Sequence, residues 1–249
     1  RQRLVRVYNT KQKVQNEYDS EAAFVGQAMM LTSEGWAVMY TSNYSRGAEK
    51  HWEIVDHQGI IFTVEKSFQD SVSGLVYIKI AGDGFRGDIS FLDWNTFDMS
   101  ESLSSLSLRG VVPAAFDRLE ENSESKQYEL WKPRFFHTIV GDVSSGDVLI
   151  AENGAFVGFV NSDKKIIESW LISTQLQPLF EKEKNEYKAL PLTGYRVEGV
   201  VVDDMFENIH GFLVTKSNTK ASSTTVGAGD VILRIEGLPF DEVTSARVM

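Results

Sequence analysis

Few residues of this sequence combine the types and the spacing that chemistry requires. The four histidines, which could act as bases or metal ligands, are His51, His57, His137 and His210. No two of them lie four residues apart on a predicted helix, where they could share a metal ion. The carboxylates are scattered over predicted loops, and no pair has a spacing that marks it as catalytic. We therefore predict no metal site and no cofactor, and we interpret these side chains as solvated or core residues.

The turn Gly-Ala-Gly-Asp at 227–230 superficially resembles a phosphate-binding loop. It lacks the third glycine and the Lys-Ser/Thr ending of such loops, and a predicted strand follows it instead of a helix. These differences argue against nucleotide binding at this turn.

The composition excludes several classes of function. Hydrophobic residues make up 42% and charged residues 24% of the 249 positions, which is typical of a globular protein. The net charge of −10, without a cluster of cations, argues against binding nucleic acid or anionic lipid. The absence of cysteine excludes disulfides and thiolate chemistry. No apolar run is long enough for a membrane span, and a first residue other than Met leaves room for an upstream segment.

Short strands separated by turns dominate the first 165 residues. The predicted strands are 4–7, 23–31, 36–41, 60–64, 76–80, 89–92, 128–131, 148–151 and 155–160. Many short strands without long intervening helices favour an antiparallel barrel or sandwich. The acidic stretch 116–127 is typical of an exposed loop.

The pattern changes near residue 166. Apolar residues between 169 and 187 recur at helical spacing, and Pro178 within this run predicts a kink or two shorter helices. Strands resume at 195–202, 211–215 and 231–235. We therefore predict an all-β (mainly β) fold with a first domain over 1–182, a charged linker over 183–190 and a second domain over 191–249.

Three fragments occur in a particular order in the first domain. They are MLTSEGWAVMYTS (30–42), LVYIKI (75–80) and VSSGDVLIAENGAFVGFV (143–160). Together they resemble the segments of trypsin-like serine peptidases of the HtrA/Deg type that carry the catalytic histidine, the aspartate and the nucleophile. The resemblance implies a double β-barrel followed by a short helix.

The triad itself is degenerate. The resemblance places Ser42 at the histidine position, Gly74 at the aspartate position and Ser145 at the nucleophile position. Asp70 is four residues too early, which is about 13 Å along a strand. In such enzymes the loss of the triad's histidine or serine costs roughly 10⁶ in turnover. The resemblance therefore implies a pseudoenzyme.

The loop around Ser145 also departs from the family. Val143 replaces a glycine, and Asp147-Val148 replaces Gly-Pro. A charge such as that of Asp147, about 4 Å from a developing oxyanion, would oppose it by up to about 4 kcal/mol at an effective dielectric near 20. We expect no catalytic role for Ser145. The alternative hypothesis is an active serine endopeptidase that uses Ser145 with a non-standard base, such as His137 or a group from another subunit.

The segment HGFLVTKSNTKASSTTVGAGDVILRIEGLPF (210–240) is similar to a PDZ module. Such modules bind a partner's C-terminus as an added strand, with its carboxylate held by loop amides. The resemblance assigns this loop and the first groove strand to Thr193, Gly194, Tyr195, Arg196 and Val197. The groove helix should begin near Thr244, five residues before the last residue, so we expect a partial PDZ-like domain.

These features support a leading hypothesis of a catalytically inactive HtrA-like protein that binds or scaffolds proteins or peptides. Its expected partners are protein or peptide C-termini, with homo-oligomerisation left open and nucleic acid excluded. The resemblance implies an extracytoplasmic bacterial setting, periplasmic or cell-surface, and a membrane anchor upstream of Arg1. A third hypothesis discards the resemblance and treats the chain as a β-rich structural protein. A fold without two packed six-stranded barrels would favour it.

Overall fold

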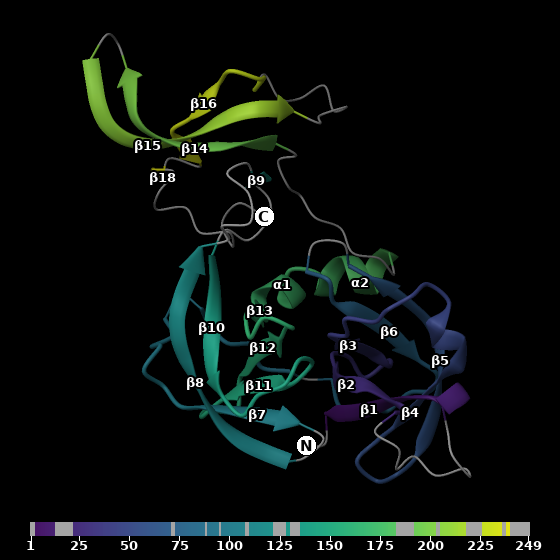
Figure 1. Ribbon diagram of the computed structural model, residues 1–249. Helices are drawn as coiled ribbons and strands as arrows, with labels where there is room; N and C mark the ends of the chain where they lie inside the picture. The colour runs from purple at the N-terminus through teal and green to yellow at the C-terminus, as the bar shows by residue number, and fades with distance from the viewer. Residues whose placement is uncertain are drawn as a thin grey trace. The chain divides into compact units, whose positions relative to one another are not determined.

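The computed structural model (Figure 1) describes residues 3–12, 22–70, 73–87, 89–94, 96–107, 110–121, 128–129, 135–182, 192–202, 205–217, 226–235 and 238–239. The chain forms two compact units. The first comprises Arg1–Arg118 with His137–Phe180, and the second Leu119–Phe136 with Glu181–Met249. The second unit thus includes residues 119–136, which the sequence analysis placed in the first domain. The predicted linker 183–190 lies outside the described residues.

Six strands of the first unit close into a barrel. They are β1 (Leu4–Asn9), β2 (Phe24–Met30), β3 (Trp36–Met39), β4 (Trp52–Val55), β5 (Ile61–Gln69) and β6 (Val76–Ile80), with the 3₁₀ helices η1 (Thr10–Gln12) and η2 (Ala48–His51). Their order around the barrel is β1-β2-β3-β6-β5-β4, and β4 pairs back to β1. Side chains such as Val7, Met39 and Ile78 fill the interior and are fully buried.

Six further strands form a second, nearly closed barrel. They are β7 (Leu103–Ser107), β8 (Gly110–Glu121), β10 (Phe135–Gly141), β11 (Val148–Ala151), β12 (Phe156–Val160) and β13 (Ile166–Glu168), in the order β10-β8-β7-β11-β12-β13. A single bridge between Thr138 and Lys165 links the two outer strands. Beside it, the Ile139 amide donates to the Lys164 carbonyl at 3.1 Å.

Both barrels therefore have the same strand order when followed around: first, second, third, sixth, fifth, fourth. This confirms the predicted mainly-β double barrel and is compatible with a trypsin-like architecture. A fold without two barrels, which would have favoured the structural-protein hypothesis, is not the one that the chain adopts.

Two predictions of secondary structure are wrong. Residues 116–121, expected to be part of a loop, belong to the long strand β8. Phe116 is only 9% exposed inside the second barrel, and the adjacent Asp117 and Arg118, whose charges suggested a loop, are exposed residues of the same strand. The predicted strand 89–92 makes only one bridge, from Phe91 to Phe156, because it belongs to the connection between the barrels. Residues 122–127 lie outside the described part of the chain.

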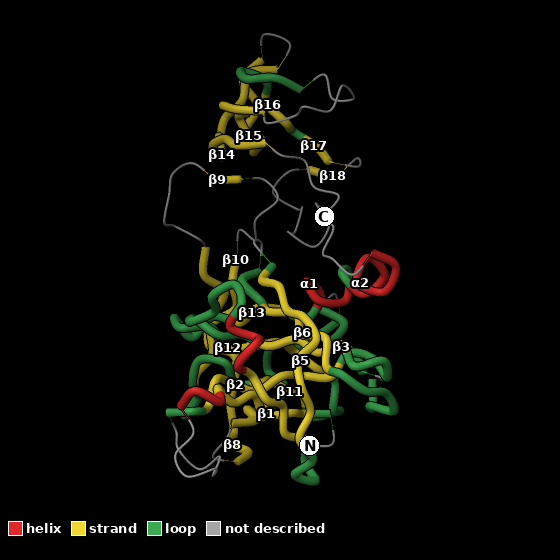
Figure 2. The backbone as a smooth tube through the Cα atoms, turned by 90° about the vertical axis from the view of Figure 1, so that its right-hand side faces the viewer, coloured by secondary structure: helices red, strands yellow, loops and turns green. Residues whose placement is uncertain are grey.

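Two short helices follow the second barrel, as the position of the proline predicted. They are α1 (Trp170–Ser173) and α2 (Leu176–Lys182), coloured red in Figure 2 among strands and loops. The break falls at Thr174 and Gln175 rather than at Pro178. Pro178 lies in the first turn of α2, where the amide that it lacks would have no helical partner. None of the helices formed by described residues is long and apolar enough to cross a membrane.

The second unit is built on a long hairpin of β14 (Leu192–Val202) and β15 (Met205–Ser217). With β9 (Tyr128–Glu129) and β16 (Val231–Ile232) they form a sheet in the order β16-β15-β14-β9. The strands β17 (Arg234–Ile235) and β18 (Leu238–Pro239) form a separate pair. The second unit has a small core, in which the buried residues among those described are Leu192, Phe212 and Val214.

Candidate functional site

A cleft of about 340 Å³ lies where the two barrels meet. The first barrel contributes residues 24–27 at the start of β2 and residues 40–43 after β3. The second barrel contributes Ser107, Val112, Asp142, Ser144, Ser145, Gly146 and Asp147. Beside the cleft, the side-chain amide of Gln27 donates a hydrogen bond of 3.2 Å to the Leu106 carbonyl and so joins the two barrels. Ser42 and Ser145 thus lie in the walls of one cleft, although they are far apart in the sequence.

The turn that carries Ser145 is held by the carboxylate of Asp147. Its Oδ2 accepts hydrogen bonds from the Ser144 amide and the Ser105 hydroxyl, both at 2.9 Å, and the residue is only 5% exposed. The Gly146 amide donates to the Val160 carbonyl at 2.8 Å, which ties the turn to β12. Asp147 therefore shapes the loop as a buried acceptor, and Ser145 stands exposed at the tip.

Gly74 lies behind the segment that carries Ser42. Its φ of +74° is in the left-handed region, and a Cβ added there would lie 3.9 Å from the ring of Tyr40, which lines the cleft. A residue at this position would therefore direct its side chain towards the end of β3. As glycine it offers no carboxylate to orient a base.

Asp70 does not take over this role. The residue is 3% exposed, and its Oδ2 accepts hydrogen bonds from the backbone amide of Ser73, at 2.9 Å, and from the Ser73 hydroxyl. Its own amide donates to the Leu75 carbonyl at 2.8 Å, and its carbonyl accepts from the Gly74 amide at 2.9 Å. Asp70 thus closes the turn between β5 and β6.

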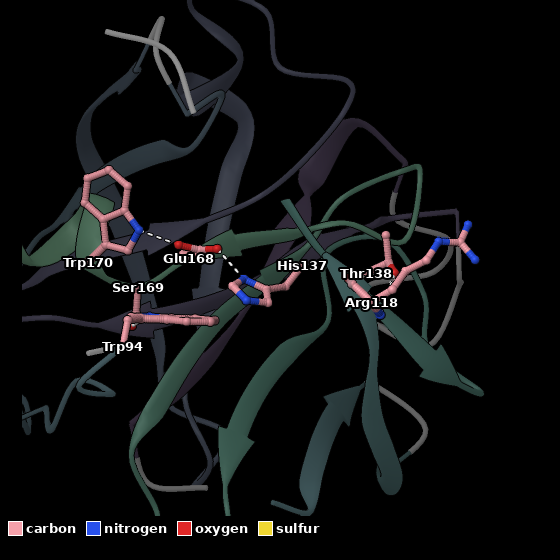
Figure 3. Close-up of polar contacts among 7 residues, drawn as sticks. All are labelled: Trp94, Arg118, His137, Thr138, Glu168, Ser169 and Trp170. Atoms are coloured by element: carbon pink, nitrogen blue, oxygen red, sulfur yellow. Dashed lines mark hydrogen bonds and ion pairs between the residues drawn. The ribbon is translucent and has the colours of Figure 1, made fainter. Parts of the chain in front are cut away.

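No histidine is found among the described residues that line the cleft. His51 ends η2, His57 lies in the turn between β4 and β5, and His210 belongs to β15 of the second unit. His137 projects from β10, and its Nδ1 is 2.6 Å from Oε1 of Glu168 (Figure 3).

The ring of His137 is also packed against aromatic side chains. It lies 4.9 Å from Trp94 and 5.5 Å from Phe116, measured between ring centroids. The other carboxylate oxygen of Glu168 accepts from the Trp170 indole, and the Trp94 indole donates to the Ser169 hydroxyl at 3.3 Å. Sequence reasoning missed this cluster. The alternation of His137 with Ile139, and of Glu168 with Ile166, is the signal that both side chains point into a barrel.

The five predicted peptide-binding residues lie within one strand. Residues 193–197 form part of β14 and pair with Lys216 to Gly211 of β15. Thr193 and Gly194, assigned to the loop, are thus paired strand residues, and a Cβ on Gly194 would lie 2.0 Å from the Leu213 carbonyl. The opposite edge of β14 pairs with β9 only at Thr193 and Gly194. From Tyr195 onward, this edge has no strand partner within the described part of the chain.

The turn at 227–230 is filled by the side chain of Asp230, one of its own residues. The Gly227 amide donates to the Asp230 carboxylate at 2.7 Å, and the Asp230 amide donates to the Gly227 carbonyl at 3.2 Å. A phosphate would have to displace this carboxylate and would be repelled by it. The described residues also contain no cluster of three or more histidines and carboxylates that could hold a metal ion.

Neither a protein-family model nor a curated protein matches this sequence. The fold and the cleft therefore define the class: a mainly-β protein with one closed and one nearly closed six-stranded barrel, compatible with a trypsin-like double barrel.

Proposed function

We propose that this protein is a catalytically inactive relative of HtrA-type serine peptidases that binds segments of other proteins in the cleft between its barrels. The observation that carries the proposal is the composition of the cleft. Ser42 and Ser145 line it together and Gly74 lies behind Tyr40, so the three positions that the resemblance assigns to a triad lie close to the cleft and carry neither an imidazole nor a carboxylate.

The chemistry of the cleft suits binding better than hydrolysis. A serine hydroxyl is a weak nucleophile unless a neighbouring base removes its proton. The side chains that line the cleft with Ser145 include hydroxyls, the amides of Gln27 and Asn43, the carboxylate of Asp142, and apolar groups such as the ring of Phe24. A concave site that mixes apolar and hydrogen-bonding groups is typical of binding pockets.

Labelling with a fluorophosphonate, which reacts only with an activated serine, tests the absence of catalysis. The wild type and Ser145→Ala are compared beside an active trypsin-like enzyme as positive control. We expect no labelling of either folded protein. Labelling of the wild type that disappears in Ser145→Ala would overturn the proposal and establish a working nucleophile.

The alternative, an active endopeptidase with a non-standard base, draws on one feature. His137 and Glu168 form a histidine–carboxylate pair of the kind that orients a catalytic base. This pair is packed against Trp94 and Phe116 and does not line the cleft, so it would have to move to reach Ser145. Labelling that is lost in both Ser145→Ala and His137→Ala would support this alternative.

The proposal extends to the second unit as a PDZ-like binder of C-termini. The open edge of β14 from Tyr195 offers backbone groups to an added strand, which is how such modules bind. Calorimetry with one peptide in free-carboxylate and C-terminally amidated forms tests this, with Arg196→Ala as the variant. Equal binding of both forms would argue against carboxylate recognition. The extracytoplasmic, membrane-anchored setting rests on the family resemblance alone.

A further inference from the structure

Two further hollows continue from the cleft between the barrels: the first adjoins the cleft, and the second adjoins the first. One, of about 590 Å³, lies between β1, the turn at 55–59 and the β7–β8 hairpin. The other, of about 710 Å³, lies between the start of β1, Arg86 and Ile89, and the β11–β12 hairpin. Gln27 and Ser107 are shared by the cleft and the first hollow, and Leu4, Leu106 and Val111 by the two hollows. We call the two hollows together the arginine groove.

The arginine groove has a charge opposite to that of the protein. Arg6 lines the first hollow, and Arg3 and Arg86 line the second. Within the described part of the chain, none of the three forms an ion pair. The net charge of the whole chain is −10, so the concentration of arginines in this groove is a local exception.

Against the three arginines, the described lining residues of the groove include two carboxylates, which leaves an excess of one positive charge. Asp56 accepts hydrogen bonds from the amides of Gln58 and Ile60, both at 2.8 Å, and so serves its own turn. Glu152 lies at the β11–β12 turn of the second hollow. The guanidinium groups therefore remain available as fork-shaped donors to carboxylates.

The walls between the arginines are apolar. Leu4 and Leu106 are partly buried, and Val111 is 47% exposed. An extended chain alternates its side chains, so it could place apolar groups on these walls and acidic groups on the arginines. A nucleic acid would need more cations than three and would be repelled by the rest of the surface.

We propose that the arginine groove binds an extended, acidic segment of a partner protein, continuous with the segment held in the cleft. The inference rests on the proposed function and deepens it, because it names the chemistry of the partner. The acidic side chains pair with Arg6 and Arg86 on the rims, and the apolar ones contact Leu4 and Val111.

Selection of random twelve-residue peptides on the full chain, followed by fluorescence anisotropy, tests this inference. The variants are Arg6→Glu/Arg86→Glu and, as a control outside the groove, Lys50→Glu on η2, which is also exposed. An exposed ion pair contributes up to about fivefold in affinity. We therefore expect peptides rich in Asp and Glu that bind about tenfold more weakly to the double variant and equally well to Lys50→Glu. A selected peptide in which Glu is replaced by Gln should also bind the wild type about tenfold more weakly.

The outcomes separate this inference from the proposed function. Selected peptides without an acidic excess, or with equal affinity for the double variant, would overturn the inference. If such peptides were still blocked by Ser42→Trp in the cleft, the proposed function would stand. Selection of no peptide would overturn both. A single-stranded DNA twelve-mer that binds as tightly as the peptides, and is lost in the double variant, would make the groove a nucleic-acid site and refute the inference.

Discussion

The two barrels share one strand order but close in different ways. In the first, β1 and β4 pair over four successive residue pairs, from Arg6 with Val55 to Asn9 with Trp52. In the second, the outer strands β10 and β13 meet at one bridge, Thr138 with Lys165. The order of strands is thus a property of topology, whereas the extent of closure depends on the residues at the seam.

The side chains that fill the two barrels also differ. The first barrel is filled mainly with aliphatic and methionine side chains such as Val7, Met30 and Met39. The second has the half-buried pair His137 and Glu168 beside its incomplete seam, with side chains 18% and 16% exposed. The two side chains of this pair satisfy each other, and Glu168 also accepts from the Trp170 indole.

The largest expected effects come from truncating the core of each barrel. Ile78→Ala in the first barrel and Leu149→Ala in the second each remove a fully buried side chain, which typically costs about 2–5 kcal/mol. Because both barrels belong to one compact unit, we expect each variant to lower one shared unfolding transition. Urea unfolding followed by tryptophan fluorescence and circular dichroism measures this. Two separate transitions, each moved by one variant only, would show that the barrels unfold independently.

Two glycines, one in each barrel, should differ in the stability that is lost when a Cβ is added. A Cβ on Gly158 of the second barrel would lie 2.1 Å from the Ile167 carbonyl, with φ at +151°. On Gly26 of the first barrel it would meet only the flexible end of Met39, at 2.7 Å. We expect Gly158→Ala to cost about 3 kcal/mol because strand β13 must shift, and Gly26→Ala to cost less than about 1 kcal/mol. Thermal unfolding measures the stability of both variants. An equal loss of stability in the two would mean that the spacing between β12 and β13 adjusts to the added Cβ.

The polar pair of the second barrel should matter less than its core. Glu168→Ala leaves the Nδ1 of His137 and the Trp170 indole without their acceptor, which should cost about 1–3 kcal/mol. Asp163→Ala, in the exposed turn before β13, removes the same charge and serves as control. Urea denaturation should show a loss for the first variant only. Similar stability of both would mean that the pair contributes nothing to closing this barrel.

The smallest effect is expected in the connection between the barrels. The Ser100 backbone amide, 2.8 Å from Oδ1, and then the Ser100 side chain lower the pKa of Asp98 below its usual value. A lowered pKa stabilises the fold above the unfolded-state pKa, and this contribution is lost as the pH falls through the folded-state value. Asp98→Asn should therefore lower the melting temperature slightly at pH 7 and less at pH 3. A larger difference at pH 3 would contradict this assignment.

The strands that pair with close neighbours could be predicted from the sequence. Val76–Ile80 and Val148–Ala151 are found with the predicted bounds because they are short apolar runs between clear turns. Strands β7 and β10 were missed, and the end of β8 was taken for a loop, because buried hydroxyl residues such as Ser105 and Thr138, and the charged run after Phe116, interrupt the apolar pattern. Pairing within the second barrel holds these residues in extended form, as in β7, which pairs with both β8 and β11.

For the candidate site, the sequence alone provided a resemblance, which assigns Ser42, Gly74 and Ser145 to triad positions, and none of these residues carries an imidazole. Tertiary structure decided that Ser42 and Ser145 face one cleft, that Asp147 is a buried acceptor, and that His137 is paired with Glu168. Residue types follow from the order of amino acids, and short-range turns follow from neighbours along the chain. Which distant side chains meet depends on how the strands pair and the barrels close, and this is settled only by the free energy of the whole folded unit.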